Sequence, residues 1–184
     1  MNTELILLCH AATHAMKAGI FPSRDDPIDP ADCAGLADRL GTGGRRVVTS
    51  PARAARETAA SLAVDAKVDP SFDDLDYGRW HGRSIRDVHE EDPRGLAAWL
   101  SDPASAPHGG ESIEHLATRV MAGLDRYARR EPHVIVTHAI VIKIMLARVL
   151  DAPLASVYAM DLEPLAPVTI VGGDAHWRLR VRAC

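Results

Sequence analysis

Three short apolar runs, at residues 5–8, 47–49 and 134–137, are the clearest pattern in the chain. Each is of strand length and uninterrupted by charge, which is typical of a strand covered on both faces in a parallel sheet. Each also precedes a stretch that favours a helix. A strand followed by a helix is the unit of crossover connections, so the pattern predicts an α/β fold with a mostly parallel sheet.

The helical stretches differ in how much of their surface is apolar. Ser50 is expected to be the N-cap, with Pro51 at the first helical position, of an alanine-rich helix that runs to about Ala63. Residues 111–130 predict an amphipathic helix. Its apolar face is expected to hold Ile113, Leu116, Ala117, Val120, Leu124, Tyr127 and Ala128. Residues 140–150 are apolar nearly all round, which predicts a buried helix.

Near the end of the chain, residues 168–171, a turn at 172–174 and the alternation at 177–182 predict an edge hairpin. The alternation sets Trp177, Leu179 and Val181 against three arginines, which we expect to form a solvated face. Residues 70–107 form an aromatic, turn-rich insertion with short helices expected at 84–90 and 93–100. We expect this insertion to be a lid over the carboxyl ends of the strands, where open α/β sheets place their ligand sites.

Composition narrows the class of protein. The chain has 184 residues, of which 47% are hydrophobic and 25% charged, with a net charge of -4. We therefore expect one globular domain over residues 1–184, no nucleic acid as a partner and no membrane span, since Lys143 and Arg148 interrupt the longest apolar stretch. With no basic leader the protein is expected to be cytoplasmic. A homodimer is possible.

Two histidines stand directly after apolar runs, and they are the first candidates for chemistry. His10 follows the first run and His138 the third, while Ser50 follows the second. The carboxyl ends of parallel strands meet at one edge of a sheet, so these side chains can converge. An imidazole is uncharged near neutral pH, which suits it to act as a nucleophile or as a general base.

Five ordered segments resemble the histidine phosphatase (phosphoglycerate mutase-like) superfamily. They are His10 with Thr13; Ser50, Ala55, Thr58 and Ala59; Asp74 with Gly78, Trp80 and Gly82; Gly109, Gly110, Glu111 and Ser112; and Thr137 with His138. The resemblance implies a three-layer α/β/α sandwich with a mostly parallel central sheet and an antiparallel edge strand. It also implies that His10 is a nucleophile that forms a phosphohistidine, that His138 and two arginines hold the phosphoryl group, and that Asp74 protonates the leaving oxygen.

The chain departs from that pattern at both phosphate-binding arginines. Cys9 stands where the family has the first arginine, and Ala54 where it has the second. Each such donor is worth about a hundred- to a thousand-fold in rate, so the loss of two predicts a pocket that is poorly suited to a phosphomonoester. Ala11 and Ala139 replace glycines, which indicates a narrower pocket. Nearby arginines could replace the missing charge, namely Arg53, Arg56, Arg79 and Arg83.

Further side chains are expected at the mouth of this pocket. The expected substrate-binding set is Cys9, Thr13, Ser50, Arg53, His81, His108 and Ala139. Cys9 has two open interpretations, a buried structural thiol or a reactive thiolate beside His10. The extra imidazoles of His14, His81 and His108 lack ligand spacing on one element, so neither a metal nor a cofactor is expected.

Three functions follow from these observations. In the first, His10 and His138 act as an acid–base pair on a small metabolite that is less anionic than a phosphomonoester. In the second, a weak phosphomonoester hydrolase works through phospho-His10. In the third, the domain binds a small molecule without turnover.

Overall fold

A mixed six-stranded sheet lies at the centre of the structure, a computed structural model that describes residues 3–63, 65–128, 130–173 and 176–181. The strand order is β3-β2-β4-β1-β5-β6. The strands are β1 (Thr3–Cys9), β2 (Arg46–Thr49), β3 (Lys67–Val68), β4 (His133–Thr137), β5 (Pro167–Gly173) and β6 (His176–Arg180). The first four strands in this order are parallel, and β5 and β6 join antiparallel. The expected mostly parallel sheet is therefore confirmed.

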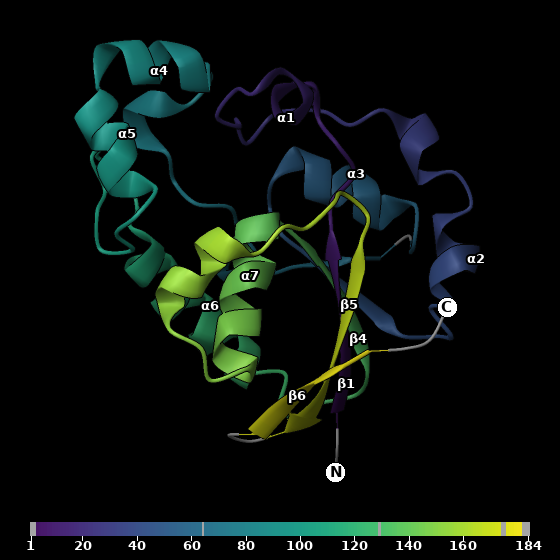
Figure 1. Ribbon diagram of the computed structural model, residues 1–184. Helices are drawn as coiled ribbons and strands as arrows, with labels where there is room; N and C mark the ends of the chain where they lie inside the picture. Colours follow the sequence, from purple (N-terminus) through teal and green to yellow (C-terminus); the bar gives the residue numbers. More distant parts are fainter. Residues whose placement is uncertain (1–2, 64, 129, 174–175, 182–184) are drawn as a thin grey trace.

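Helices cover both faces of the sheet, because side chains that alternate along β1 and β4 point to opposite sides (Figure 1). Leu5, Leu7 and Ile135 pack in one cluster with α6 (Ile113–Asp125) and α7 (Ala139–Val149). Ile6 and Leu8 pack in a second cluster with α2 (Leu36–Leu40) and α3 (Arg53–Ala60). This arrangement is the expected three-layer sandwich.

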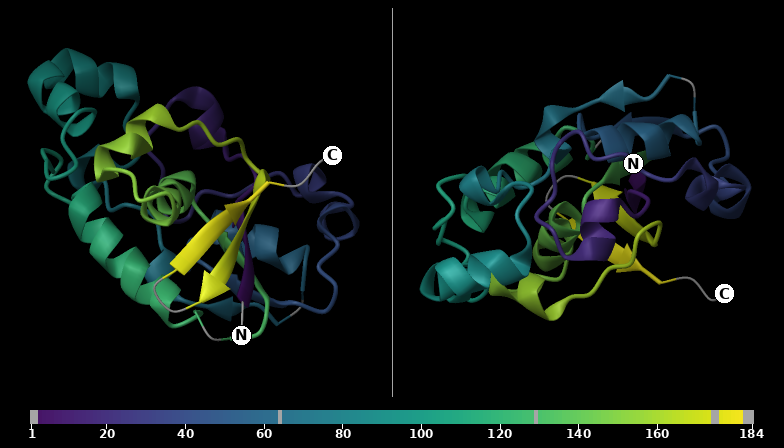
Figure 2. Two further views of the ribbon diagram at one scale, coloured as in Figure 1. Left: turned by 60° about the horizontal axis from the view of Figure 1, so that its bottom comes forward. Right: turned by 90° about the horizontal axis from the view of Figure 1, so that it is seen from above.

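Short helices occupy the connections between the main strands and helices (Figure 2). They are α1 (His14–Ala18), η1 (Pro30–Cys33), η2 (Pro70–Phe72), η3 (Gly78–Trp80), α4 (Ile85–Glu91), α5 (Pro93–Trp99) and η4 (Leu154–Ala159). The hydroxyl of Ser84 caps α4, and the carboxylate of Asp92 caps α5, each by accepting a bond from a backbone N–H. The two short helices expected within residues 70–107 are thus confirmed.

Two helix boundaries differ from the sequence prediction. The helix after β2 begins at Arg53 with Ala52 as its N-cap, because the Ser50 hydroxyl turns to other partners. The helix expected to reach residue 130 ends at Asp125. The expected edge hairpin is confirmed, since β5 and β6 pair antiparallel and β6 is the outer strand of the sheet.

The outer strand β6 also packs less tightly than its alternation predicts. Trp177 is nearly buried in the cluster that includes the α7 side chains, but Leu179 is 36% exposed and Val181, the residue after the strand, is 85% exposed. Arg178 and Arg180 are exposed, as expected for a solvated face. Arg182 and part of the predicted turn, Asp174, lie outside the described residues.

Within the residues that the structure describes, no helix is long and apolar enough to cross a bilayer.

Ile135 tests the role of the central strand in stability, since it lies at the middle of β4 and is fully buried. We expect Ile135→Ala to lower the free energy of unfolding by about 2–5 kcal/mol, because the truncation leaves a cavity between the sheet and its helices. Urea denaturation measures this loss. Leu100→Ala, at a position that is 52% exposed, is the matched control, with an expected change within about 0.5 kcal/mol. Equal losses in the two variants would contradict this placement of the core.

Candidate active site

The parallel pairing of β1 with β4 brings His10 and His138 together. Cys9 lies opposite Thr137 in the register, so the next residue of each strand leaves the sheet at the same edge. The backbone N–H of His10 donates to the carbonyl of Thr137 at 2.9 Å. The two imidazole rings meet edge to face, with centroids 4.9 Å apart and an interplanar angle of 71°.

His10 presents one ring nitrogen to the cavity. Its Nδ1 lies 2.7 Å from the carbonyl oxygen of Ala11, which can only accept, so Nδ1 carries the hydrogen. The lone pair therefore remains on Nε2. Burial, followed by the neighbouring His138 ring, lowers the pKa of His10 to about 4, so the imidazole is uncharged near neutral pH. A neutral ring with a free Nε2 can act as a nucleophile or as a base.

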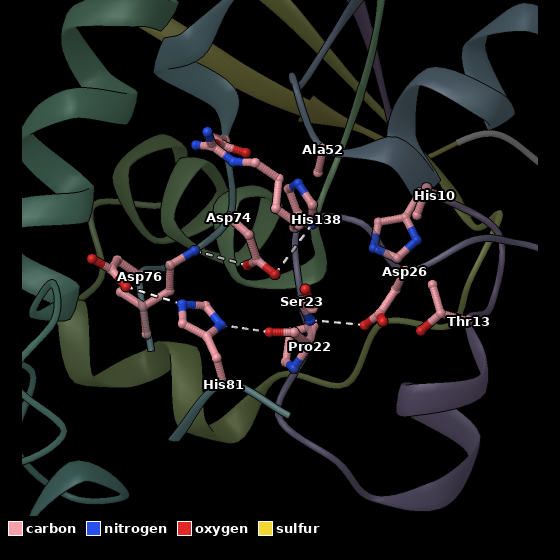
Figure 3. A pocket seen from close by; sticks show the side chains of 14 residues that line it. His10, Thr13, Pro22, Ser23, Asp26, Ala52, Asp74, Asp76, His81 and His138 are labelled. Atoms are coloured by element: carbon pink, nitrogen blue, oxygen red, sulfur yellow. Dashed lines mark hydrogen bonds and ion pairs between the residues drawn. The ribbon is translucent and has the colours of Figure 1, made fainter. Parts of the chain in front are cut away.

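Asp74 faces His138 across the cavity (Figure 3). Its Oδ2 lies 3.4 Å from Nδ1 of His138. Burial raises the pKa of Asp74 to about 6, which brings the carboxyl group close to the range in which it can donate a proton. Burial also lowers the pKa of His138 to about 4, so this ring is neutral as well.

Arg119 of α6 holds the loop that carries Asp74. Its guanidinium binds both carboxylate oxygens of Glu111, at 3.1 and 2.7 Å. The same group donates at 3.1–3.2 Å to the carbonyls of Pro70, Ser71, Asp73 and Asp74. The Thr137 hydroxyl adds a bond of 2.6 Å to the carbonyl of Phe72. These bonds satisfy a loop that has no sheet partner, and they determine where Asp74 points.

The backbone segments around Gly78 and Gly110 pack directly against each other beside this loop. Gly78 has a φ of 46°, and a Cβ added there would lie 2.4 Å from the carbonyl oxygen of His108. A Cβ added at Gly110 would lie 2.1 Å from the carbonyl oxygen of Asp76. Only glycine allows such a close approach, which explains why glycines recur in both motifs.

The histidines and Asp74 line a cavity of about 470 Å³. Its other lining residues are Thr13, Pro22, Ser23, Arg24, Asp26, Ala52, Ala54, Asp73, Leu75, Asp76 and His81. Four aspartates but only one arginine therefore line the described part of this cavity, and Arg24 is already paired with Asp73. Acidic side chains therefore outnumber basic ones among the described residues that line the cavity.

The remaining residues of the expected site fall into two groups. Thr13 and His81 line the cavity, with His81 2.7 Å from the Pro22 carbonyl and 3.0 Å from Asp76. Ser50 is buried against His138 at 2.8 Å. Cys9 is buried beneath the site beside the amide of Ala139, and burial raises its pKa to about 12, which keeps the thiol neutral.

Other predicted residues do not reach the cavity. Arg53 pairs with Glu57 on the exposed side of α3, at 2.7 Å. His108 is buried against Trp80, with ring centroids 5.0 Å apart. Arg79 pairs with Asp92, and Arg83 with Glu91. Arg53 and His108, which were expected to bind substrate, are therefore not among the residues that line the cavity, and neither are Arg79 and Arg83, the alternatives for the missing charge.

Several residues of the site are not marked by any motif in the sequence. Arg24 and Asp26 sit in an irregular loop that carries no motif, so nothing in the local pattern marks them. Arg119 was recognisable only as a cation eight positions after Glu111 on the same predicted helix. Among the described residues, no group of three or more histidine, cysteine, aspartate or glutamate side chains is placed to hold a metal ion.

Comparison with known proteins shows the family to which this chain belongs. The sequence profile of the histidine phosphatase superfamily (branch 1) matches residues 5–183. The chain belongs to this superfamily. A protein of Mycobacterium tuberculosis named as bifunctional is 32% identical over 182 residues, which cover 91% of this chain and 50% of the relative. The chain thus spans about half the length of the curated relatives that it matches first.

Two further relatives match over nearly their whole length. The adenosylcobalamin/alpha-ribazole phosphatase of Salmonella typhimurium is 29% identical over 199 residues, covering 95% of this chain and 98% of that protein. The solved structure of a mycobacterial glucosyl-3-phosphoglycerate phosphatase superposes with a TM-score of 0.82 at 24% identity, covering 97% and 98% of the two chains. At that identity the superposition shows a shared fold.

The lowered pKa values of His10 and His138 predict how stability depends on pH. Each falls from 6.5 to about 4 on folding, so the folded chain binds fewer protons than the unfolded chain between these values. The free energy of unfolding must then decrease as the pH falls from about 6.5 to 4. Asp74 acts in the opposite direction, because its pKa is raised from 3.8 to about 6.

We expect a double variant, His10→Gln with His138→Gln, to lose less stability over that pH range, by on the order of 2–4 kcal/mol. Urea unfolding at a series of pH values measures the difference. Parallel curves for the double variant and the natural chain would mean that the two imidazoles are not buried in the neutral form.

Proposed function

We propose that this member of the superfamily is an enzyme that uses His10 and His138 on a small metabolite less anionic than a phosphomonoester. The observation that carries the proposal is the charge of the cavity, where Asp26, Asp73 and Asp76 stand against Arg24 and Asp74 adds a carboxyl group that can be protonated. A phosphomonoester brings about two negative charges, and its transfer depends on cationic hydrogen-bond donors. A neutral or cationic substrate meets no such penalty here.

The absent arginines support the same conclusion. Ala54 lines the cavity where the resemblance places a guanidinium, and Cys9 is a buried, neutral thiol at the other such position. Arg53, the nearest arginine to Ala54 in sequence, is held by Glu57. The chemistry that remains is that of a neutral imidazole at His10 and an acid at Asp74.

In this mechanism the Nε2 lone pair of His10 attacks the substrate or takes a proton from it. Asp74, which lines the same cavity, protonates the departing atom. His138 contacts both groups, since its ring packs on His10 and its Nδ1 faces Asp74. The three side chains therefore act on one small volume of the cavity.

A weak phosphomonoester hydrolase is the second candidate, favoured by Arg24 at the cavity and by the phosphatases among the relatives. In that reaction His10 Nε2 forms a bond to phosphorus while the bond to the leaving oxygen breaks, and Asp74 gives its proton to that oxygen. Water then hydrolyses the phosphohistidine. Arg24 would have to exchange Asp73 for the phosphoryl group.

Three nitrophenyl compounds with one leaving group but different charge separate these candidates. They are nitrophenyl acetate, which is neutral, bis-nitrophenyl phosphate, which carries one negative charge, and nitrophenyl phosphate, which carries two. We expect His10-dependent kcat/KM to be lowest for the dianion, and His10→Gln to remove most of the turnover of the preferred compound. His133→Gln, at a buried histidine at the other end of β4, controls for damage to the fold.

If the phosphomonoester is the best substrate and an acid-labile phosphohistidine accumulates, the second candidate is correct. If no compound is turned over in a His10-dependent manner, the chain binds its ligand without catalysis, as in the third sequence-based hypothesis.

Restoring one guanidinium tests the charge argument directly. We expect Ala54→Arg to raise the hydrolysis of nitrophenyl phosphate by about a hundred- to a thousand-fold relative to the natural chain, because a cation then faces the phosphoryl oxygens. Ala54→Gln is the matched control, with a long polar side chain and no charge. A steady-state assay with each variant gives the comparison, and an unchanged rate for the arginine variant would argue against missing positive charge as the cause.

A further inference from the structure

The hydroxyl of Ser50 has three polar partners but only one hydrogen, so the direction of each of its hydrogen bonds is fixed. Its Oγ lies 2.8 Å from Nε2 of His138, 3.1 Å from Oδ1 of Asp73 and 3.1 Å from the backbone nitrogen of Ala52. A serine hydroxyl has one hydrogen to donate and two lone pairs that accept. The backbone N–H of Ala52 can only donate, so it uses one of the lone pairs.

Asp73 decides where the single hydrogen goes. Its other oxygen, Oδ2, forms an ion pair with the guanidinium of Arg24. An ionised carboxylate accepts and cannot donate, so Ser50 must donate its hydrogen to Asp73 Oδ1. The second lone pair of Ser50 then has to accept a hydrogen from Nε2 of His138.

The tautomer of His138 follows from this count. A neutral imidazole carries one hydrogen, and it is now on Nε2, so Nδ1 is left with a lone pair. Nδ1 is buried and has no hydrogen-bond partner among the described residues. The atom that it faces is Oδ2 of Asp74, at 3.4 Å. A lone pair repels a carboxylate but accepts a hydrogen bond from a carboxylic acid.

We propose that Asp73 and Ser50 are positioning residues that hold His138 as its Nε2–H tautomer, so that the Nδ1 lone pair accepts a hydrogen bond from the protonated carboxyl group of Asp74. The hydrogen-bond chain runs from Arg24 through Asp73, Ser50 and His138 to Asp74. Its effect is to favour the protonated form of the acid at the site where the acid is needed. The catalytic consequence rests on the proposed function, whereas the positions of the protons do not.

The other groups around Asp74 and His138 also influence the pKa of Asp74, and they are the same in all the variants compared. Burial is the main reason that the pKa of Asp74 is raised, to about 6. The titratable and charged groups that face Asp74 or His138 come from β1, the loop after η2, η3 with its flanks, and α6. They are Cys9, His10, Asp73, Tyr77, His81 and Arg119.

Ring-nitrogen NMR of ¹⁵N-labelled protein at pH 8 tests the tautomer without any turnover. In the natural chain we expect the hydrogen of His138 on Nε2 and an unprotonated Nδ1. In Ser50→Ala we expect the hydrogen to move to Nδ1, where it can bind the Asp74 carboxylate. Ser50→Thr keeps a hydroxyl and should keep the natural pattern.

His108 is an internal control for the fold in every variant. Its Nδ1 accepts from the backbone N–H of Gly110 at 3.0 Å, so it is an Nε2–H tautomer for a separate reason. Its signals should not change. Asp74→Asn offers a second variant, since the amide can donate a hydrogen to Nδ1 of His138 and should preserve the Nε2–H tautomer.

Carboxyl-carbon NMR gives the readout that a merely structural role for Ser50 would not move. We expect the pKa of Asp74 to fall in Ser50→Ala by about one unit or more, because an Nδ1–H stabilises the carboxylate. The acidic limb of any pH–rate profile should move down with it. An Nδ1–H tautomer in the natural chain, or an unchanged tautomer and Asp74 pKa in a folded Ser50→Ala, overturns the proposal. Inactivity toward all three nitrophenyl compounds would instead count against the proposed function alone.

Discussion

Everything at the site depends on the parallel register between β1 and β4, in which Cys9 lies opposite Thr137. The register brings two residues that are far apart in sequence to the same edge of the sheet, where their rings touch. Because the strands are buried on both faces, a slip by one residue would reverse which side chains face each helix layer. The packing of Leu5, Leu7 and Ile135 on one face and of Ile6 and Leu8 on the other therefore also maintains the distance between the two imidazoles.

The polar groups around these rings form a series of hydrogen bonds, in which each buried side chain fixes the position of the next. Arg119 binds Glu111 and four carbonyls, which places the loop of Asp73 and Asp74 against His138. Ser50 joins Asp73 to His138 through its hydroxyl, and for that reason it does not cap α3. A residue that the local sequence favours as a helix cap is thus used by the site, which illustrates how a tertiary contact overrides a local preference.

The acidic cavity is the feature that separates this chain from the expectation that its family resemblance sets. Its superfamily includes relatives named as phosphatases, and the neutral His10 and raised Asp74 pKa suit a nucleophile and an acid. The carboxylates that line the cavity do not suit a dianion. The fold of the superfamily is present here together with a cavity lined by four aspartates, and the fold and the charge of a site are separable properties of one scaffold.

The sequence alone determined the class of fold, the order of the main strands and helices, and the placing of His10 and His138 at strand ends, because these follow from hydrophobic runs and short motifs that act locally. Trp80 and the glycines beside it were also recognisable from their motif. Only the tertiary structure decided that Arg24 and Asp26 join the cavity, that Arg53 and His108 do not, and that Ser50 bonds His138. Those outcomes depend on loop paths and on competing partners such as Glu57 and Trp80, and such competition is resolved only when distant segments pack together.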